Sequence, residues 1–210
     1  MIRGADRTRD LFPSRNTCHA WTVDATVRAA HGGDADALAR VHLESWRWAY
    51  TGLLPDTYLS RLREDELAAR WWRRLAAGEM DESIRVLEHG GRVRGFVTFG
   101  PLKDDPSWLG YAGEVYMLYL APELVGQGHG GELLSSAFEE LARHRCHWSV
   151  VWVLARNERA RRFYERAGMR LDGARRWDPF GERAVPVVRY AKALNPVFDW
   201  GAVRTRSRIG

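Results

Sequence analysis

The chain has 210 residues, of which 45% are hydrophobic and 28% are charged, and these proportions are typical of a soluble globular protein. No apolar run approaches the ~18 residues that a bilayer-spanning helix needs, and the charged first twenty residues do not fit a secretory signal. The length favours one domain with a sizeable core. The two cysteines, Cys18 and Cys146, form neither a disulfide framework nor a metal-binding spacing, so we expect reduced thiols, a cytoplasmic location and no metal site.

The formal net charge of +5 belongs to the two ends of the chain. Four arginines and two aspartates lie in residues 1–15 and three arginines lie in residues 201–210, so the part between them is formally neutral. This distribution does not predict a nucleic-acid-binding groove, and we expect neither nucleic acid nor a membrane as a partner. We expect a flexible tail over 1–21, one domain over 22–194 and a basic tail over 195–210.

Hydrophobic periodicity and turn residues predict an alternation of strands and helices along the domain. Gly32, Gly33 and Asp34 predict a loop in which the aspartate caps the first helix. Asn157 is expected to cap a later helix, and Gly168 is expected to follow that helix. The order of elements predicts an α/β (α+β) fold, a mixed sheet with helices on both faces. In chain order, the predicted elements are a strand at 26–30, helices at 35–50 and 56–77, strands at 83–89, 92–100 and 115–120, a helix after residue 131, a strand at 148–155, a helix at 158–167 and strands at 169–177 and 183–191.

The stretch from Glu114 to Gly131 is the most informative part of the sequence. Its apolar and aromatic first part predicts a buried strand that Pro122 ends, and its glycines precede a helical pattern. Glycines let a ligand approach backbone N–H groups, and the positive end of the helix dipole points at the same place. The stretch therefore predicts a phosphate-binding loop. Its glycines are Gly126, Gly128, Gly130 and Gly131.

Two familiar phosphate-binding motifs fit this loop poorly. A Walker loop needs Lys followed by Ser or Thr after its last glycine, but Glu132 follows here. The glycines match a G-x-G-x-x-G dinucleotide fingerprint, but residues 121–125 separate them from the strand, where that motif needs an immediate tight turn. The next predicted strand also ends without an acidic residue for a ribose hydroxyl.

A third interpretation is a loop that binds coenzyme A. Val125–Gly130 resembles the Q/R-x-x-G-x-G/A motif of the GCN5-related N-acetyltransferase (GNAT) family, with Val125 in place of Gln or Arg. Asn157–Met169 resembles the family's N-x-x-A-x-x-F-Y-x-x-x-G-F segment, with Met169 in place of Phe. Leu118–Pro122 and Glu44–Pro55 are also similar to family segments. The resemblance extends over residues 26–194 and implies a sheet that is mostly antiparallel.

The resemblance implies that acetyl-CoA is the co-substrate and that its acetyl group moves directly to a primary amine. Tyr164 matches the family's usual general acid, and Glu114 lies where many members place a carboxylate that draws a proton from the amine. Trp46, Tyr50 and Trp108 are candidates for the acceptor pocket. The expected acetyl-CoA-binding residues are Leu118, Tyr119, Leu120, Val125, Gly126, Gln127, Gly128, His129, Gly130, Gly131 and Asn157.

Two questions stay open at the level of the sequence. The same fold could serve a non-catalytic, regulatory module that binds acyl-CoA, although the presence of Tyr164 and Asn157 favours an enzyme. Trp71 and Trp72 cannot both face the core from one helix, so one of them could cover a contact in a homodimer. The sequence does not identify the amine acceptor, which could be a small molecule or a peptide.

Overall fold

The computed structural model describes residues 25–78, 82–103 and 111–194. The predicted tails at 1–21 and 195–210, and Trp108, a candidate for the acceptor pocket, lie outside the described residues. The strands are β1 (Ala25–Ala29), β2 (Ser83–His89), β3 (Arg92–Pro101), β4 (Ala112–Leu120), β5 (Trp148–Leu154), β6 (Arg170–Phe180) and β7 (Arg183–Ala193). The helices are α1 (Ala35–Ala49), α2 (Asp56–Ser60), α3 (Glu64–Ala77), α4 (His129–Arg143) and α5 (Glu158–Arg166), with short 3-10 turns η1 (Gly32–Asp34) and η3 (Pro122–Leu124).

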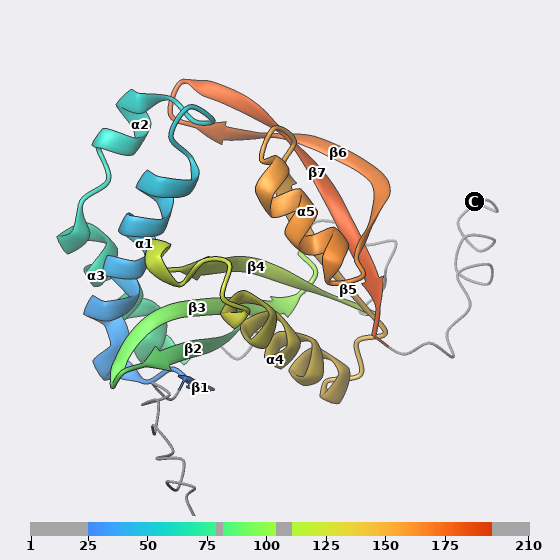
Figure 1. Cartoon of the computed structure of the whole chain (residues 1–210), viewed down its shortest axis with the longest axis horizontal. Coiled ribbons are helices and arrows are strands. Elements are labelled where there is room, and N and C mark those ends of the chain that lie inside the picture. Colours follow the sequence, from blue (N-terminus) through green and yellow to red (C-terminus); the bar gives the residue numbers. More distant parts are fainter. Residues whose placement is uncertain (1–24, 79–81, 104–110, 195–210) are drawn as a thin grey trace, which may run out of the picture.

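The described strands form one seven-stranded sheet in the order β1-β2-β3-β4-β5-β7-β6. Neighbouring strands are antiparallel except β4 and β5, which run parallel. Figure 1 shows α4 and α5 on one side of this sheet and α1 and α3 beside its first strands. The prediction of a mixed, mostly antiparallel sheet flanked by helices is confirmed.

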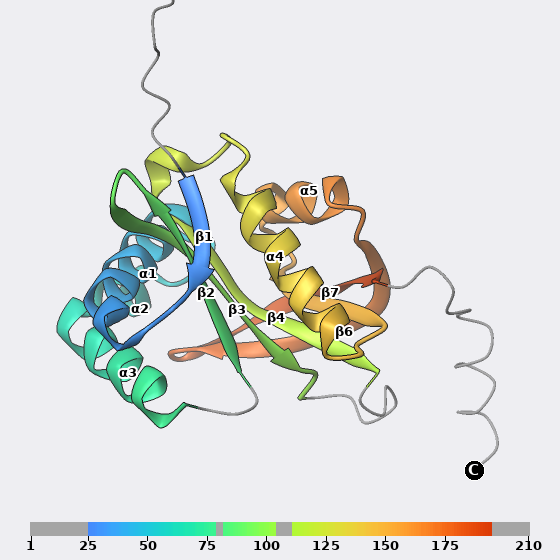
Figure 2. The ribbon, with the colours of Figure 1, turned by 90° about the horizontal axis from the view of Figure 1, so that it is seen from below.

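Side-chain alternation on the strands builds a core on each face of the sheet. Phe96 and Val97 are neighbours on β3 and both are completely buried. Because successive side chains point to opposite faces, Phe96 packs with residues of α1 and α3, and Val97 packs with residues of α4. Figure 2 shows the corresponding arrangement, with α1 and α3 on one side of β2 and β3 and α4 on the other.

The predicted helix over 56–77 is wrong in its middle, because α2 and α3 are separate helices. Arg63, between them, has extended backbone angles, with φ −115° and ψ 136°. The chain carries no glycine or proline there, but Glu64, Asp65 and Glu66 form the first turn of α3. Acidic side chains at a helix N-terminus stabilise the helix dipole, so these residues favour a new helix start. Trp71 on α3 is buried, whereas Trp72 is 61% exposed, as the helical spacing requires.

The helix ends differ in how well the sequence predicted them. The Asn157 side chain accepts a 3.0 Å hydrogen bond from the Ala160 N–H, which confirms the cap of α5. Gly168 follows α5 with φ +81°. Asp34 occupies the N-cap position of α1, but its carboxylate accepts hydrogen bonds from Arg28 at 2.8 and 3.0 Å instead of capping that helix. The predicted side-chain cap at Asp34 is therefore wrong, and the carboxylate ties α1 to β1.

The terminal pair of strands is longer than the sequence predicted. Strand β6 continues to Phe180, past Pro179, and β7 extends to Ala193. Proline is tolerated there because β6 is the edge strand of the sheet and its N–H side needs no ladder partner. The extension brings the hairpin tip near α2, where Tyr58 packs edge-on against Phe180 with ring centroids 5.7 Å apart. Among the described helices, none is long and apolar enough to cross a membrane.

Candidate active site

The two parallel strands at the centre of the sheet separate from each other. β4 and β5 pair only where Ala112–Val115 face Trp148–Val151. Beyond that point β4 stays with β3 and β5 stays with β7. A bulge contributes to the separation, because Thr98 pairs with Met117 and Phe99 pairs with Val115, which leaves Tyr116 as the extra residue. Figure 1 shows the two strands diverging, with α5 beside them.

A cavity of about 1120 Å³ lies where the two strands diverge. Its walls come from β4, β5, the glycine loop, α5, the second half of α1 and the β6–β7 hairpin. Gln127 and His129 do not line it. Of the residues that the sequence predicted for the site, the cavity walls include Trp46, Tyr50, Glu114, Leu118, Tyr119, Leu120, Val125, Gly126, Gly128, Gly130, Gly131, Asn157 and Tyr164.

The glycine loop presents backbone N–H groups to this cavity. Gly126 and Gly128 have φ of +92° and +100°, which is the left-handed region that favours glycine. Within the described part of the chain, the N–H groups of Gly126, Gly128, His129 and Gly130 have no protein acceptor. They lie at the N-terminus of α4, where the helix dipole favours negative charge. A phosphate oxygen is the kind of acceptor that satisfies such donors.

Three side chains of the loop make protein contacts instead. Val125 packs against the core that α4 buries. The Gln127 side-chain amide donates a 2.6 Å hydrogen bond to the Glu123 carbonyl oxygen. His129 Nδ1 lies 3.2 Å from a Glu132 carboxylate oxygen, and the His129 ring packs against His89. These contacts leave the backbone N–H groups as the free donors that this loop offers to a ligand.

The edge of β4 that faces β5 is available for a ligand beyond Val115. The Ala121 N–H donates a 2.8 Å hydrogen bond to the Arg94 carbonyl oxygen on β3. Because backbone groups alternate in direction along a strand, the groups of Leu118 and Leu120 point the other way, towards the gap. The Leu120 carbonyl oxygen accepts a 2.7 Å hydrogen bond from the Ser45 hydroxyl. The Leu118 groups are thus placed to pair with an extended ligand.

Tyr164 and Glu114 both border the cavity and both are buried, with 7% and 6% of their surfaces exposed. The Tyr164 ring packs against Phe163 on α5 and Tyr190 on β7, with centroids 5.0 and 6.4 Å away. Burial, together with the nearby Tyr50 hydroxyl, raises the pKa of Tyr164 well above its usual range. The phenol is therefore protonated at neutral pH.

An aromatic group forms the end of the cavity away from the glycine loop. Trp46 on α1 lies one turn before Tyr50, the residue that follows this helix, with ring centroids 5.2 Å apart and an interplanar angle of 89°. The Tyr50 and Tyr119 hydroxyl oxygens are 3.3 Å apart. Burial raises the pKa of both tyrosines. Phe180 completes the group from the β6–β7 hairpin, 6.2 Å from Trp46.

The sequence did not predict four of the side chains at this end, namely Trp152, Arg176, Asp178 and Phe180. Asp178 binds the Arg176 guanidinium at 2.7 and 3.2 Å, and Arg176 lies over the Trp152 ring at 4.2 Å. On β6, Arg176, Asp178 and Phe180 alternate with the exposed Trp177 and Pro179. That alternation was the available signal, but it could not show which part of the molecule the partly buried face would meet.

Comparison with known proteins agrees with this architecture. The Acetyltransferase (GNAT) family profile matches residues 41–169. An uncharacterized N-acetyltransferase of Bacillus subtilis, YuaI, is 36% identical over 132 residues, which are 63% of this chain and 73% of that protein. A probable N-acetyltransferase of Mycobacterium tuberculosis, Rv2775, is 29% identical over 165 residues, which are 78% of this chain and 91% of that protein.

Solved structures share the fold at lower identity. The PaiA N-acetyltransferase of Thermoplasma acidophilum, solved in complex with coenzyme A, is 20% identical with a TM-score of 0.65, and the match covers 81% of this chain and 99% of that one. YncA of Salmonella typhimurium, solved with its cofactor acetyl-CoA, is 22% identical with a TM-score of 0.62, covering 84% and 97%. The split sheet, the glycine loop and these matches together show that the chain belongs to the acetyltransferase (GNAT) family.

Proposed function

We propose that this protein is an N-acetyltransferase that moves the acetyl group of acetyl-CoA directly to a primary amine. One observation carries the proposal: a single cavity combines the unpaired N–H groups of the glycine loop, an open strand edge and two buried side chains suited to proton transfer. A dinucleotide would not need the open edge of β4 next to the loop. Acetyl-CoA uses all three features: its pyrophosphate needs the N–H groups, its extended arm needs the strand edge, and its thioester needs the two proton-transfer side chains.

The backbone supplies most of the proposed acetyl-CoA site. The pyrophosphate accepts hydrogen bonds from the N–H groups at Gly126, Gly128 and Gly130, and the pantetheine arm lies along the open edge of β4 as an added strand, which leaves the Leu118 N–H for the thioester oxygen. Asn157 serves twice, because its side-chain oxygen caps α5 while its NH2 group stays available to a pantetheine carbonyl. The residues present therefore fit the co-substrate, although Val125 offers no polar side chain.

The proposed transfer is a single displacement at the thioester carbon. The neutral amine nitrogen attacks that carbon, and the developing oxyanion is stabilised by the Leu118 N–H. The carbon–sulfur bond then breaks, and the thiolate takes a proton from the Tyr164 hydroxyl. The proton that the amine loses passes to Glu114, directly or through water. The products are an N-acetylated amine and coenzyme A with a free thiol. Glu114 then releases its proton to solvent and Tyr164 regains one from solvent, which restores both residues for the next turnover.

The raised pKa of Tyr164 affects how this acid works. A thiol in water has a pKa near ~8.5, so proton transfer from a phenol is uphill. The thiolate forms in the same buried cavity, however, and burial disfavours both anions alike. Position next to the sulfur atom then matters more than acidity, and the high pKa keeps the proton on Tyr164 throughout the working pH range.

A thiol-release assay tests this proposal. The protein is mixed with acetyl-CoA and a panel of primary amines, the free thiol is measured, and N-acetylated products are identified by mass spectrometry. We expect thiol release that depends on an amine and that falls in Tyr164→Phe. Tight binding of acetyl-CoA without amine-dependent thiol release would instead support the non-catalytic acyl-CoA-binding module. Absence of acetyl-CoA binding would contradict both.

A further inference from the structure

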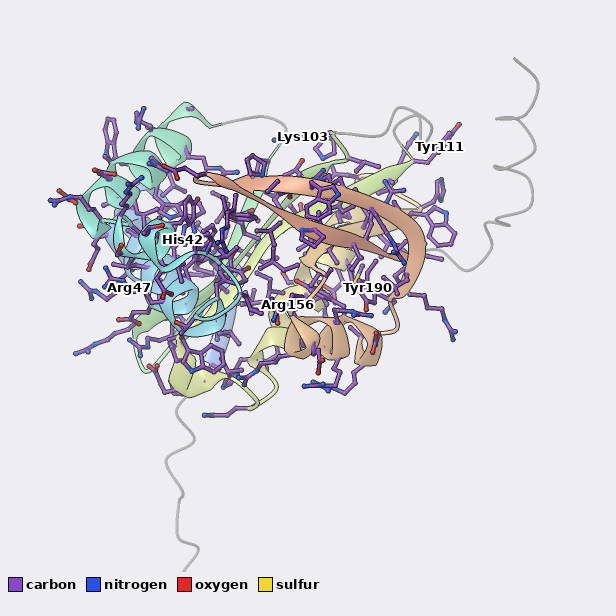
Figure 3. The ribbon with its side chains drawn as sticks, turned by 90° about the horizontal axis from the view of Figure 1, so that it is seen from above. His42, Arg47, Lys103, Tyr111, Arg156 and Tyr190 are labelled. Atoms are coloured by element: carbon purple, nitrogen blue, oxygen red, sulfur yellow. The ribbon has the colours of Figure 1, made fainter. Side chains whose placement is uncertain are left out.

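A second cavity adjoins the first cavity near its aromatic end, where we place the amine acceptor. It has a volume of about 380 Å³ and lies between the turn that follows α1 and the start of β7. Leu53 and Arg156 line both cavities, so the two are neighbours that share a wall. Figure 3 shows Arg156 between α1 and α5, at the boundary of the two halves of the molecule. An acceptor with its amine in the first cavity could therefore extend into the second.

Two arginine side chains give the second cavity positive charge. Arg156 and Arg183 line it, and within the described residues neither forms an ion pair or a hydrogen bond through its side chain. Most other arginines near the first cavity are engaged: Arg176 binds Asp178, and Arg159 lies over the Trp48 ring at 4.2 Å. Asp56 is the one acidic residue among the lining residues of the second cavity. This cavity therefore offers two uncommitted guanidinium groups to a ligand.

The backbone fixes the position of Arg156 relative to the cavities. The Ala155 N–H donates a 2.9 Å hydrogen bond to the Pro186 carbonyl oxygen on β7, and the Asn157 N–H donates one of 2.9 Å to Leu154. The Arg161 guanidinium donates a 3.2 Å hydrogen bond to the Ala155 carbonyl oxygen. These bonds hold the turn between β5 and α5, so Arg156 starts from a fixed point although its side chain is exposed.

We propose that the second cavity binds an anionic group of the acceptor, so that the preferred acceptor is a primary amine that also carries a carboxylate, such as an amino acid. This inference rests on the proposed acetyl transfer. A guanidinium group offers paired donors that match the two oxygens of a carboxylate. Apolar side chains, Leu53 and Leu54 with Val185, line the rest of the second cavity and suit the body of such a molecule. A polycationic amine would meet Arg156 and Arg183 with like charge.

Matched acceptors test the preference. L-phenylalanine and L-leucine are compared with their carboxamides, which keep the amine and the side chain but lose the negative charge, and spermidine serves as the polycation. We expect kcat/KM to be about 10- to 100-fold higher for the acids than for the amides, the range that a charge-assisted hydrogen bond supports. Amine basicity cannot produce this result, since the amide form has the more readily deprotonated amine.

Substitutions of the two arginines test whether the second cavity causes this preference for acids. Arg156→Gln and Arg183→Gln are each expected to bring the acid-to-amide ratio of kcat/KM towards one. Arg162→Gln is the matched control, because Arg162 is an exposed arginine of α5 that pairs with Glu158 and lines neither cavity. Equal use of acids and amides, a preference for spermidine, or an unchanged ratio in both variants would overturn the inference while leaving acetyl transfer intact.

A binding measurement separates this inference from the proposed function. Calorimetric titration of L-phenylalanine and its carboxamide into protein saturated with coenzyme A needs no turnover. Tighter binding of the acid that is lost in Arg156→Gln supports the anion site even if no amine is acetylated, in which case the proposed function fails alone. Equal binding of acid and amide overturns the anion site.

Discussion

The two ends of the cavity are built in different ways. The proposed co-substrate end comes mainly from one continuous stretch, the strand, loop and helix start between Glu114 and Gly131, and it offers backbone groups. The acceptor end comes from α1, the turn after β5 and the β6–β7 hairpin, which are far apart in the chain, and it offers aromatic and charged side chains. Backbone groups suit a ligand that never changes, whereas side chains can adapt to different acceptors.

This comparison predicts that the two ends respond separately to substitution. Changes in the glycine loop should alter acetyl-CoA affinity, and changes in the hairpin should alter use of the acceptor. The proton-transfer residues between them should alter turnover.

The largest effect is expected for Gly128→Val at the co-substrate end. An added Cβ would meet no protein atom within 4 Å, so the substitution acts through the φ of +100° and through the new side chain at the N–H groups. We expect acetyl-CoA affinity, measured by calorimetry, to fall about 100-fold or more, because a misaligned loop loses several charge-assisted hydrogen bonds.

Gly91→Val is the matched control for this substitution. Gly91 also has a positive φ, +71°, and open space around a Cβ, but it lies in the β2–β3 turn and does not line the cavity. It imposes the same kind of backbone strain without touching the loop. Loss of acetyl-CoA binding in Gly91→Val as well would mean that destabilisation, not the loop, explains the result.

Tyr164→Phe tests the region between the two ends. We expect kcat to fall roughly 10²-fold, with little change in acetyl-CoA affinity, because the substitution removes only the hydroxyl. The raised pKa of Tyr164 adds a prediction for the alkaline side of the pH profile: deprotonation of Tyr164 would lower kcat only above about pH 10, so kcat should show no loss between neutral pH and that value. Unchanged turnover in Tyr164→Phe would remove this residue from the mechanism.

His42 on α1 provides a stability test on the face of the sheet that α1 and α3 cover. The His42 ring stacks on the Tyr119 ring with centroids 5.3 Å apart. Figure 3 labels His42 among the densely packed side chains around α1. Burial, assisted by Arg70 and Arg74, lowers its pKa to about 4. Because the unfolded chain binds a proton at His42 below about pH 6.5 and the folded chain does not, stability should fall on acidification between these values.

The expected slope is a change of about tenfold in the unfolding equilibrium per pH unit. Carboxylates titrate in part of the same range, so the measurement is the difference between the wild-type protein and His42→Leu in denaturant unfolding from pH 7 to pH 4. A difference that does not vary with pH would show that His42 takes up its proton in the folded protein as readily as in the unfolded chain.

The smallest effect is expected for Phe180→Ala at the acceptor end. Removal of this ring should raise KM for the amine about fivefold, since a partly buried aromatic contact contributes about 1 kcal/mol, and should leave acetyl-CoA affinity unchanged. Trp177→Ala is the control on the same strand, because Trp177 is 69% exposed and does not line the cavity. A parallel loss of acetyl-CoA affinity in Phe180→Ala would contradict the separation of the two ends.

The sequence predicted the parts of the fold that local patterns determine. Asn157 and Gly168 mark the two ends of α5, and both could be predicted because capping depends on a few adjacent residues. The burial of one of Trp71 and Trp72 and the exposure of the other follow from helical spacing alone. The break between α2 and α3 was missed because no glycine or proline marks it, and the acidic first turn of α3 is a weaker signal.

The site was predicted unevenly for the same reason. Glycine loops have a local signature, so the sequence predicted most of the cavity wall that lies between Leu118 and Gly131, but it also named Gln127 and His129, which do not line the cavity. The separation of β4 from β5 depends on pairing with β3 and β7, which no local pattern reveals. The contact of Arg176 with Trp152, and that of Phe180 with Trp46, joins elements far apart in the chain, so only the folded sheet brings them together.

Calorimetric titration with acetyl-CoA, with NAD and ATP as controls, tests the central claim most directly. We expect micromolar binding of acetyl-CoA alone, retained in Gly91→Val and lost in Gly128→Val. That result would establish the ligand and its position together. Binding of NAD in preference to acetyl-CoA, or no binding of acetyl-CoA, would contradict the account.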